Sequence, residues 1–397
     1  IGYFFRHGCI HALNSVLHRM KSSLETIAAR VGTEPDLESR ALSPSIQMAT
    51  TYARDDQGEH SAGFIYSRLG NPTRQKLESA LSELEGGTQA LAFASGMAAA
   101  NAILQSLKPG DRILLPHDIY YGVRALATDY FGSWGLVVDS VDMTDLKMVR
   151  DALKKPTRLV WLESPSNPQV SITDIAAVSL EAKKAGATVV VDNTWCTPLI
   201  TRPIEFGADV VMHSITKYFG GHSDVLGGAL VFAKEDMLSE RVHSIQQKAG
   251  AVLDPFSCWL TLRGIRSMAV RLERQCESAQ ALAEFLFRHP SIEKVHYPGL
   301  PTDPGHEIAS RQMKRFGGML SILVKGSAEQ AKALASNLHY FANATSLGGT
   351  ESLIEHRASI EGPGSTTPHN LLRISVGLES VEDLKSDLDR GLKKIAG

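Results

Sequence analysis

The chain has 397 residues, of which 43% are hydrophobic and 21% are charged, and its formal net charge is -2. These values are typical of a water-soluble protein of two or three domains, whose core needs no disulfide or metal to hold it together. Because acids and bases are interspersed and no apolar run reaches the roughly 18 residues that span a bilayer, the sequence excludes nucleic-acid and membrane partners.

The N-terminal segment has an unusual composition. Residues 1–19 carry arginines and histidines but no acid, and the first acid is Glu25. Such a segment is typical of an organelle transit peptide, although translated upstream sequence before Met20 explains it equally well. Residues 20–70 are rich in turn formers and predict an extended arm. We assign residues 1–67 to this leader and arm.

Strand and helix patterns alternate between about residues 75 and 235. Asn71 and Pro72 begin a helix, because asparagine caps helix N-termini and proline suits the first turn. Another helix is expected at residues 174–185. The predicted strands are residues 90–94, 112–115, 159–163, 188–192, 210–214 and 228–232. This alternation predicts an α/β fold with a mostly parallel sheet covered by helices on both faces, in a large domain at residues 68–262.

The pattern changes after about residue 262. A long amphipathic helix is expected at residues 265–288, followed by strands near residues 318–324 and 371–376 and by a final helix from Ser380. We predict a smaller C-terminal α+β domain at residues 263–397.

Two polar positions follow apolar strands at the predicted carboxyl edge of the sheet. Lys217 comes directly after one strand, and Ser214 and Thr216 beside it can donate hydrogen bonds to a phosphate. Asp192 ends the preceding strand. Alone, such a lysine is usually a solvated flank and such an aspartate usually a cap. Their occurrence one strand apart favours a shared site.

A third candidate is the turn at Ser95, Gly96 and Met97, between a strand and an apolar helix. Backbone N–H groups at a helix N-terminus can bind phosphate. Many strand–turn–helix junctions contain Ser-Gly, so this signal is weak by itself.

The chain resembles the Cys/Met-metabolism family of enzymes that depend on pyridoxal 5'-phosphate (PLP), from about Leu42 to the C-terminus. The shared motifs are Tyr66-Ser67-Arg68, Asn71-Pro72-Thr73, Ser164-Pro165-Ser166-Asn167-Pro168, Ser214-Ile215-Thr216-Lys217, Gly221-His222-Ser223-Asp224 and Ser346-Leu347-Gly348-Gly349-Thr350-Glu351-Ser352. The resemblance implies the aspartate-aminotransferase-like fold (fold type I), with a mostly parallel seven-stranded sheet.

The resemblance also implies a role for each site residue. Lys217 would hold PLP as an imine and then move protons, with Tyr120 as the second catalytic residue, stacked on the ring. The implied PLP contacts are Tyr66, Arg68, Ser95, Gly96, Met97, Tyr120, Asn167, Asp192, Thr194, Ser214, Thr216 and Lys217. Substrate contacts are implied for Ser346, Glu351 and Arg373, with Arg373 on the carboxylate. Asp192 would pair with the ring nitrogen, because a protonated ring nitrogen makes PLP an electron sink.

The family also implies an assembly. Tyr66 and Arg68 would reach the phosphate of a neighbouring subunit. Homodimers would therefore share active sites, and the usual assembly would be a homotetramer.

Other classes of protein fit less well. The sequence contains neither a Gly-x-x-x-x-Gly-Lys phosphate loop nor a Gly-x-Gly-x-x-Gly dinucleotide motif, and it shows no ligand cluster for a metal. Cys9, Cys196, Cys258 and Cys276 form no closely spaced pair, which predicts reduced thiols and a cytoplasmic protein. A catalytically inactive PLP-fold binding protein remains an alternative.

The exact reaction is less clearly indicated. Leu347, where β-lyases carry tryptophan, favours a cystathionine γ-synthase that joins an O-acylhomoserine to cysteine. Trp195 favours a β-lyase, whereas Gly122 argues against a methionine γ-lyase, in which cysteine occupies this position. The stretch at residues 362–368 is shorter than in a typical synthase, which predicts a different entrance to the substrate site. Cystathionine β- or γ-lyase and O-acylhomoserine sulfhydrylase remain alternatives, and the acyl group stays open.

Overall fold

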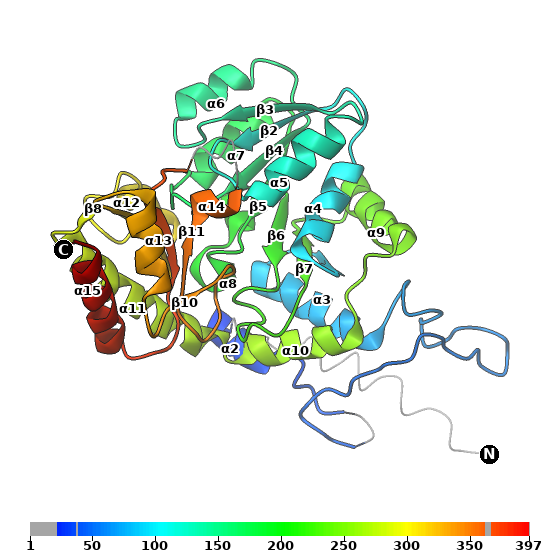
Figure 1. Ribbon diagram of the computed structural model, residues 1–397. Helices are drawn as coiled ribbons and strands as arrows, with labels where there is room; N and C mark the ends of the chain where they lie inside the picture. Colours follow the sequence, from blue (N-terminus) through cyan, green and yellow to red (C-terminus); the bar gives the residue numbers. More distant parts are fainter. Residues whose placement is uncertain (1–21, 37–38, 362–366, 397) are drawn as a thin grey trace.

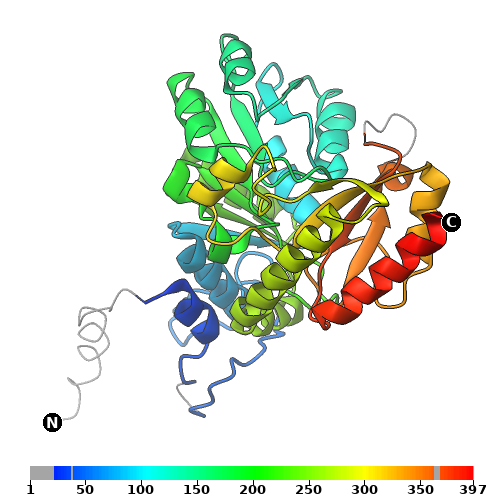
Figure 2. The same cartoon turned by 90° about the vertical axis from the view of Figure 1, so that its left-hand side faces the viewer.

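The computed structural model describes residues 22–36, 39–361 and 367–396 (Figure 1). The expected leader at residues 1–19, Cys9 and most of the shortened stretch at residues 362–368 lie outside these residues. The described chain forms a large sheet and a smaller sheet, each covered by helices (Figures 1 and 2). None of the described helices is both long enough and apolar enough to cross a membrane.

The large sheet has seven strands in the order β1-β7-β6-β5-β4-β2-β3. They are β1 (Gln89–Phe93), β2 (Arg112–Pro116), β3 (Val137–Val141), β4 (Leu159–Glu163), β5 (Thr188–Asp192), β6 (Val210–Ser214) and β7 (Gly228–Phe232). Only β7 runs antiparallel to its neighbours, β1 and β6. The predicted mostly parallel seven-stranded α/β sheet is therefore confirmed.

Helices cover both faces of this sheet. They are α3 (Pro72–Glu85), α4 (Gly96–Gln105), α5 (Tyr121–Ala125), α6 (Leu146–Ala152), α7 (Ile175–Lys184), α8 (Thr197–Ile200) and α9 (Met237–Ala249). Val189 and Val191 of β5 pack in the cluster that includes α3 and α7, whereas Val190 packs in the opposite cluster with α4. This alternation of faces explains why the strand is apolar throughout.

The smaller sheet has five strands in the order β10-β11-β12-β9-β8. They are β8 (Ile292–His296), β9 (Met319–Val324), β10 (Ala342–Asn343), β11 (Leu353–His356) and β12 (Leu371–Ser375). Helices α12 (His306–Gln312), α13 (Ala328–Ser336), α14 (Arg357–Glu361) and α15 (Val381–Ala396) belong to this part of the chain. The predicted smaller C-terminal domain with strands and helices is confirmed.

Two predicted elements differ from the structure. The helix expected at residues 265–288 is two helices, α10 (Pro255–Arg266) and α11 (Met268–Phe287), because the backbone at Ser267 leaves the helical range with φ -104° and ψ 1°. The expected arm contains a short helix, α2 (Leu24–Arg30), which the Ser23 side chain caps and which buries Leu24 and Ala28. The predicted boundary at residue 262 falls inside α10 and stays a prediction.

Candidate active site

A cavity of about 190 Å³ lies at the carboxyl edge of the large sheet. The last residues of three neighbouring parallel strands line it, namely Glu163 of β4, Asp192 of β5 and Ser214 of β6. Ligands bind at this edge in open α/β sheets. The cavity is lined by Ser95, Gly96, Met97, Tyr120, Glu163, Asn167, Asp192, Thr194, Trp195, Met212, Ser214, Thr216, Lys217, Leu226, Thr345, Ser346, Leu347, Arg357 and Arg373.

Lys217 presents its amine to this cavity. Its Nζ donates to Ser346 Oγ at 2.7 Å, which links the segment after β6 to the segment between β10 and β11. Ser346 has a φ of 94°, in the left-handed region that non-glycine residues rarely adopt. Burial, reinforced by the charge of Arg373, lowers the pKa of Lys217 to about 8. About a tenth of the amine is therefore neutral and nucleophilic at pH 7, far more than for a lysine of ordinary pKa.

Asp192 places a buried carboxyl group in the same cavity. Its Oδ1 accepts from the backbone N–H of Thr194 at 3.0 Å, and Thr194 Oγ1 in turn accepts from the Ser214 N–H at 2.8 Å. Burial raises the pKa of Asp192 because water no longer solvates the charge, while the bonds from Thr194 oppose this rise. A cation placed beside Asp192 would relieve that cost.

The N-terminus of α4 forms another wall. Ser95 caps the helix, since its Oγ accepts from the Ala98 N–H at 3.0 Å. The N–H groups of Gly96 and Met97 belong to the first turn, which has no carbonyl partner within the helix. A Cβ built on Gly96 would lie 3.1 Å from Ser214 Cβ, so glycine allows the helix end to approach β6 closely. This wall fits an anionic group such as a phosphate.

Arg373 of β12 closes the cavity from the smaller sheet. Its Nη1 donates to Asn167 Oδ1 at 3.0 Å, and its Nη2 donates to the Ser346 carbonyl at 3.0 Å and to Glu355 Oε2 at 2.7 Å. The side chain is only 4% exposed. A fixed guanidinium beside the Lys217 amine suits a substrate that carries a carboxylate next to its amine.

The donor set fits the PLP implied by the resemblance. An amine, a buried carboxyl group and a helix N-terminus line one cavity, as needed for the aldehyde, the ring nitrogen and the phosphate of this cofactor. Tyr120 supplies an aromatic ring on the wall, and its backbone N–H donates a hydrogen bond to Glu163 Oε2 at 3.0 Å.

Three of the residues assigned to the site lie away from the cavity. Tyr66 and Arg68 lie on the arm, where Arg68 Nη1 donates to the Gln247 carbonyl at 2.7 Å and its guanidinium lies 5.6 Å from the centre of the Tyr66 ring. Glu351 does not line the cavity and hydrogen-bonds with Ser223 instead. The substrate contact of Glu351 and the inter-subunit contacts of the other two stay predictions.

The structure adds cavity residues that the sequence did not single out. Glu163 is buried, and this burial together with the neighbouring Asp192 raises its pKa well above the ordinary value. Its place at the end of a predicted strand is the signal that could have identified it. Arg357 follows a strand that was not predicted, and no sequence pattern pointed to it. Thr345, Met212 and Leu226 also line the wall.

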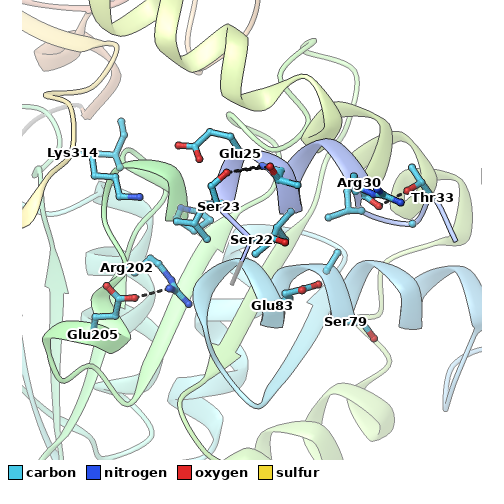
Figure 3. Close-up of a pocket in the computed structure, with 18 of the residues that line it drawn as sticks. Ser22, Ser23, Glu25, Arg30, Thr33, Ser79, Glu83, Arg202, Glu205 and Lys314 are labelled. Atoms are coloured by element: carbon cyan, nitrogen blue, oxygen red, sulfur yellow. Dashed lines mark hydrogen bonds and ion pairs between the residues drawn. The ribbon is translucent and has the colours of Figure 1, made fainter. Parts of the chain in front are cut away.

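A larger cavity of about 1250 Å³ lies elsewhere, between α2, α3 and the segments near residues 200 and 312 (Figure 3). Arg202 pairs there with Glu205 at 2.6 Å, and the Thr33 hydroxyl donates to the Arg30 carbonyl at 2.7 Å. None of the residues that the sequence assigned to the site lines it. In the part of the chain that the structure describes, no three His, Cys, Asp or Glu side chains are grouped to hold a metal.

Comparisons with known proteins agree with this geometry. The family model for the Cys/Met metabolism PLP-dependent enzymes matches residues 25–393. A cystathionine γ-synthase from Mycobacterium tuberculosis is 44% identical over 94% of this chain and 98% of its own length. A cystathionine β-lyase from Coxiella burnetii is 42% identical with the same coverage. The crystal structure of a cystathionine γ-synthase from Xanthomonas oryzae pv. oryzae in complex with cystathionine superposes with a TM-score of 0.91 at 40% identity, over 94% of this chain and 99% of that one.

Proposed function

Because the chain belongs to the Cys/Met metabolism PLP-dependent enzymes, we propose that it is a γ-synthase which replaces the acyl group of an O-acylhomoserine by cysteine and forms cystathionine. The chain is an enzyme of sulfur amino acid metabolism, and PLP is its cofactor. The observation that carries the reaction class is the buried amine of Lys217 in one cavity with Asp192 and Arg373.

Each of these cavity residues has a distinct role in the proposed reaction. Bound PLP supplies an electron sink that stabilises negative charge on the substrate carbons. Asp192 keeps the ring nitrogen protonated, and Gly96 and Met97 bind the phosphate through their N–H groups. Arg373 binds the substrate carboxylate. Lys217 Nζ accepts and returns protons on the substrate carbons, and Ser346 Oγ, 2.7 Å away, orients it.

Assembly into homodimers completes the site in this proposal. Arg68 and Tyr66 lie on an arm that extends from the body of the chain, and Tyr66 is 45% exposed. The arm segment at residues 41–70 projects beyond α10 in Figure 1. A guanidinium from this arm would add a charge-assisted bond to the phosphate of the neighbouring subunit. We propose pairs of such dimers as a homotetramer, in the cytoplasm.

The cavity wall favours a synthase. Leu347 lines the wall where β-lyases carry tryptophan, which leaves room for a second substrate. A Cβ built on Gly122 would lie 2.6 Å from Tyr120 Cε1, so the cysteine of methionine γ-lyases would displace this ring. Cystathionine β-lyase is the second candidate, because Trp195 also lines the cavity and a relative with that name is 42% identical.

Product identification tests the proposal. PLP-loaded protein is offered O-succinyl- or O-acetylhomoserine with cysteine in one reaction and cystathionine alone in another, and the products are identified by mass spectrometry. We expect cystathionine in the first reaction and little breakdown in the second. Pyruvate with homocysteine in the second reaction would show a β-lyase, and 2-oxobutyrate with cysteine would show a γ-lyase.

A further inference from the structure

Two arginines at the cavity share one buried carboxylate. Glu355 Oε2 accepts from Arg373 Nη2 at 2.7 Å and from Arg357 Nη1 at 3.1 Å. The three side chains are 3% to 4% exposed. Both arginines line the cavity and Glu355 does not. The carboxylate therefore holds the two guanidinium groups from behind the wall.

The strand pairing of the smaller sheet creates this arrangement. Glu355 of β11 lies directly opposite Arg373 of β12 in an antiparallel pair, so the two side chains project from the same face. Arg357 begins α14 immediately after β11, and Figure 1 shows α14 between the two sheets. The helix thus brings a second guanidinium to the carboxylate that holds the first.

The charges of this cluster depend on Arg357. Its Nη2 also pairs with Glu361 Oε1 at 3.2 Å, so two arginines face two carboxylates. Without Arg357, Glu355 would pair with Arg373 alone and would lose the bond that fixes its carboxylate from the other side. Charges attract strongly across short distances in a dry interior. An arginine that is fully neutralised in this way binds a substrate carboxylate more weakly.

We propose that Arg357 is a positioning residue, which shares the charge of Glu355 and through it keeps Arg373 aligned toward the carboxylate of an amino-acid substrate. This inference rests on the role of Arg373 in the proposed function. Arg357 contacts Glu355 and Glu361 with two separate nitrogens. Lysine would keep the charge but cannot reproduce this fork.

The test distinguishes the binding of a ligand's carboxylate from the binding of its amine. PLP-loaded Arg357→Gln is titrated with glycine and with glycinamide, which lacks the carboxylate, while the absorption of the bound cofactor is followed. We expect the Kd for glycine to rise about 10- to 100-fold, as for the loss of a charge-assisted hydrogen bond. The Kd for glycinamide should change less than about twofold, because the amine of both ligands meets the same groups. Arg357→Lys should give an intermediate Kd for glycine.

Arg112→Gln is the matched control. Arg112 is also a buried arginine, which pairs with Asp139 at 2.7 Å outside the cavity, so its loss reports only the general cost of removing such a group. Thermal melting of each variant shows whether it is folded, and Arg357→Lys carries the test if Arg357→Gln is not.

Three results would overturn the proposal: unchanged glycine binding in the Arg357 variants, equal weakening of both ligands, or a loss confined to ligands with a second carboxylate such as aspartate. The last result would mean that Arg357 binds substrate directly. A separate variant tests the assumption that Arg373 binds the substrate carboxylate. If Arg373→Gln still prefers glycine over glycinamide to the same extent as the wild type, this assumption is wrong.

Discussion

Replacement of Asp192 by asparagine tests the proposed partner of the PLP ring nitrogen. Asparagine has the same shape and keeps an oxygen that can accept from the Thr194 N–H, now at 3.0 Å. It removes the charge that would pair with the protonated ring. Loss of one partner of a buried ion pair costs roughly 3–5 kcal/mol, which corresponds to a decrease in kcat/KM of about a hundredfold to several thousandfold.

The stability of the PLP-free protein should change in the opposite sense or not at all. Burial raises the pKa of Asp192, so its ionised form is less favourable in the PLP-free fold than in water. The Tm of PLP-free Asp192→Asn should therefore equal or exceed that of the wild type. Steady-state kinetics of the γ-replacement and thermal melting measure the two effects.

Asp209→Asn is the control for this prediction. Asp209 Oδ2 accepts from the Val189 N–H at 2.9 Å, near the opposite end of β5. This variant should keep a normal kcat/KM. A kcat/KM for Asp192→Asn within about tenfold of the wild type, with full PLP occupancy, would refute the reasoning, because a broken buried ion pair costs more than this.

Three further predictions concern the same site. The rate at which PLP-free protein takes up PLP should rise with pH around a midpoint near 8, because only the neutral amine of Lys217 attacks an aldehyde; stopped-flow absorption measures it, and a midpoint near the ordinary lysine pKa of 10.5 would contradict it. The pKa of Glu163 is raised in the fold, so the wild type loses stability as pH rises above 4.5, where this group ionises in the unfolded chain. The Tm of Glu163→Gln minus that of the wild type should therefore increase with pH. A difference in Tm that does not change with pH would show that the fold does not raise the pKa of Glu163. Arg68→Ala should weaken PLP binding about tenfold or more in fluorescence titrations, whereas the exposed-surface control Arg150→Ala should not; unchanged PLP affinity of the Arg68 variant would contradict the shared site.

The sequence predicts most strands of the large sheet because helices bury both faces of these strands, which are therefore largely apolar. Val189, Val190 and Val191 form a continuous apolar run, and each face of the strand packs against helices. The edge strand β3 was missed, because Asp139 and Ser140 interrupt its apolar pattern and only one neighbour pairs with it. The break at Ser267 was also missed, since no proline or glycine stands at that position.

Some residues of the candidate site could likewise be predicted from the sequence, and others could not. Asp192 and Lys217 could be placed together from the sequence, because parallel strands end at one edge of a sheet. Arg373 and Asn167 are 206 residues apart, and only the family resemblance suggested that both belong to the site. The shared carboxylate of Glu355 could not be predicted, because it depends on the register between two strands that no local pattern specifies.

The central claim is that Lys217 carries PLP in the cavity at the carboxyl edge of the large sheet. Reduction of the PLP-loaded protein with borohydride, followed by proteolysis and mass spectrometry, locates the lysine that becomes covalently labelled. We expect the label on the peptide that contains Lys217, and no label on that peptide in Lys217→Ala. A label on another lysine of the wild-type protein, or substantial turnover by Lys217→Ala, would contradict the account.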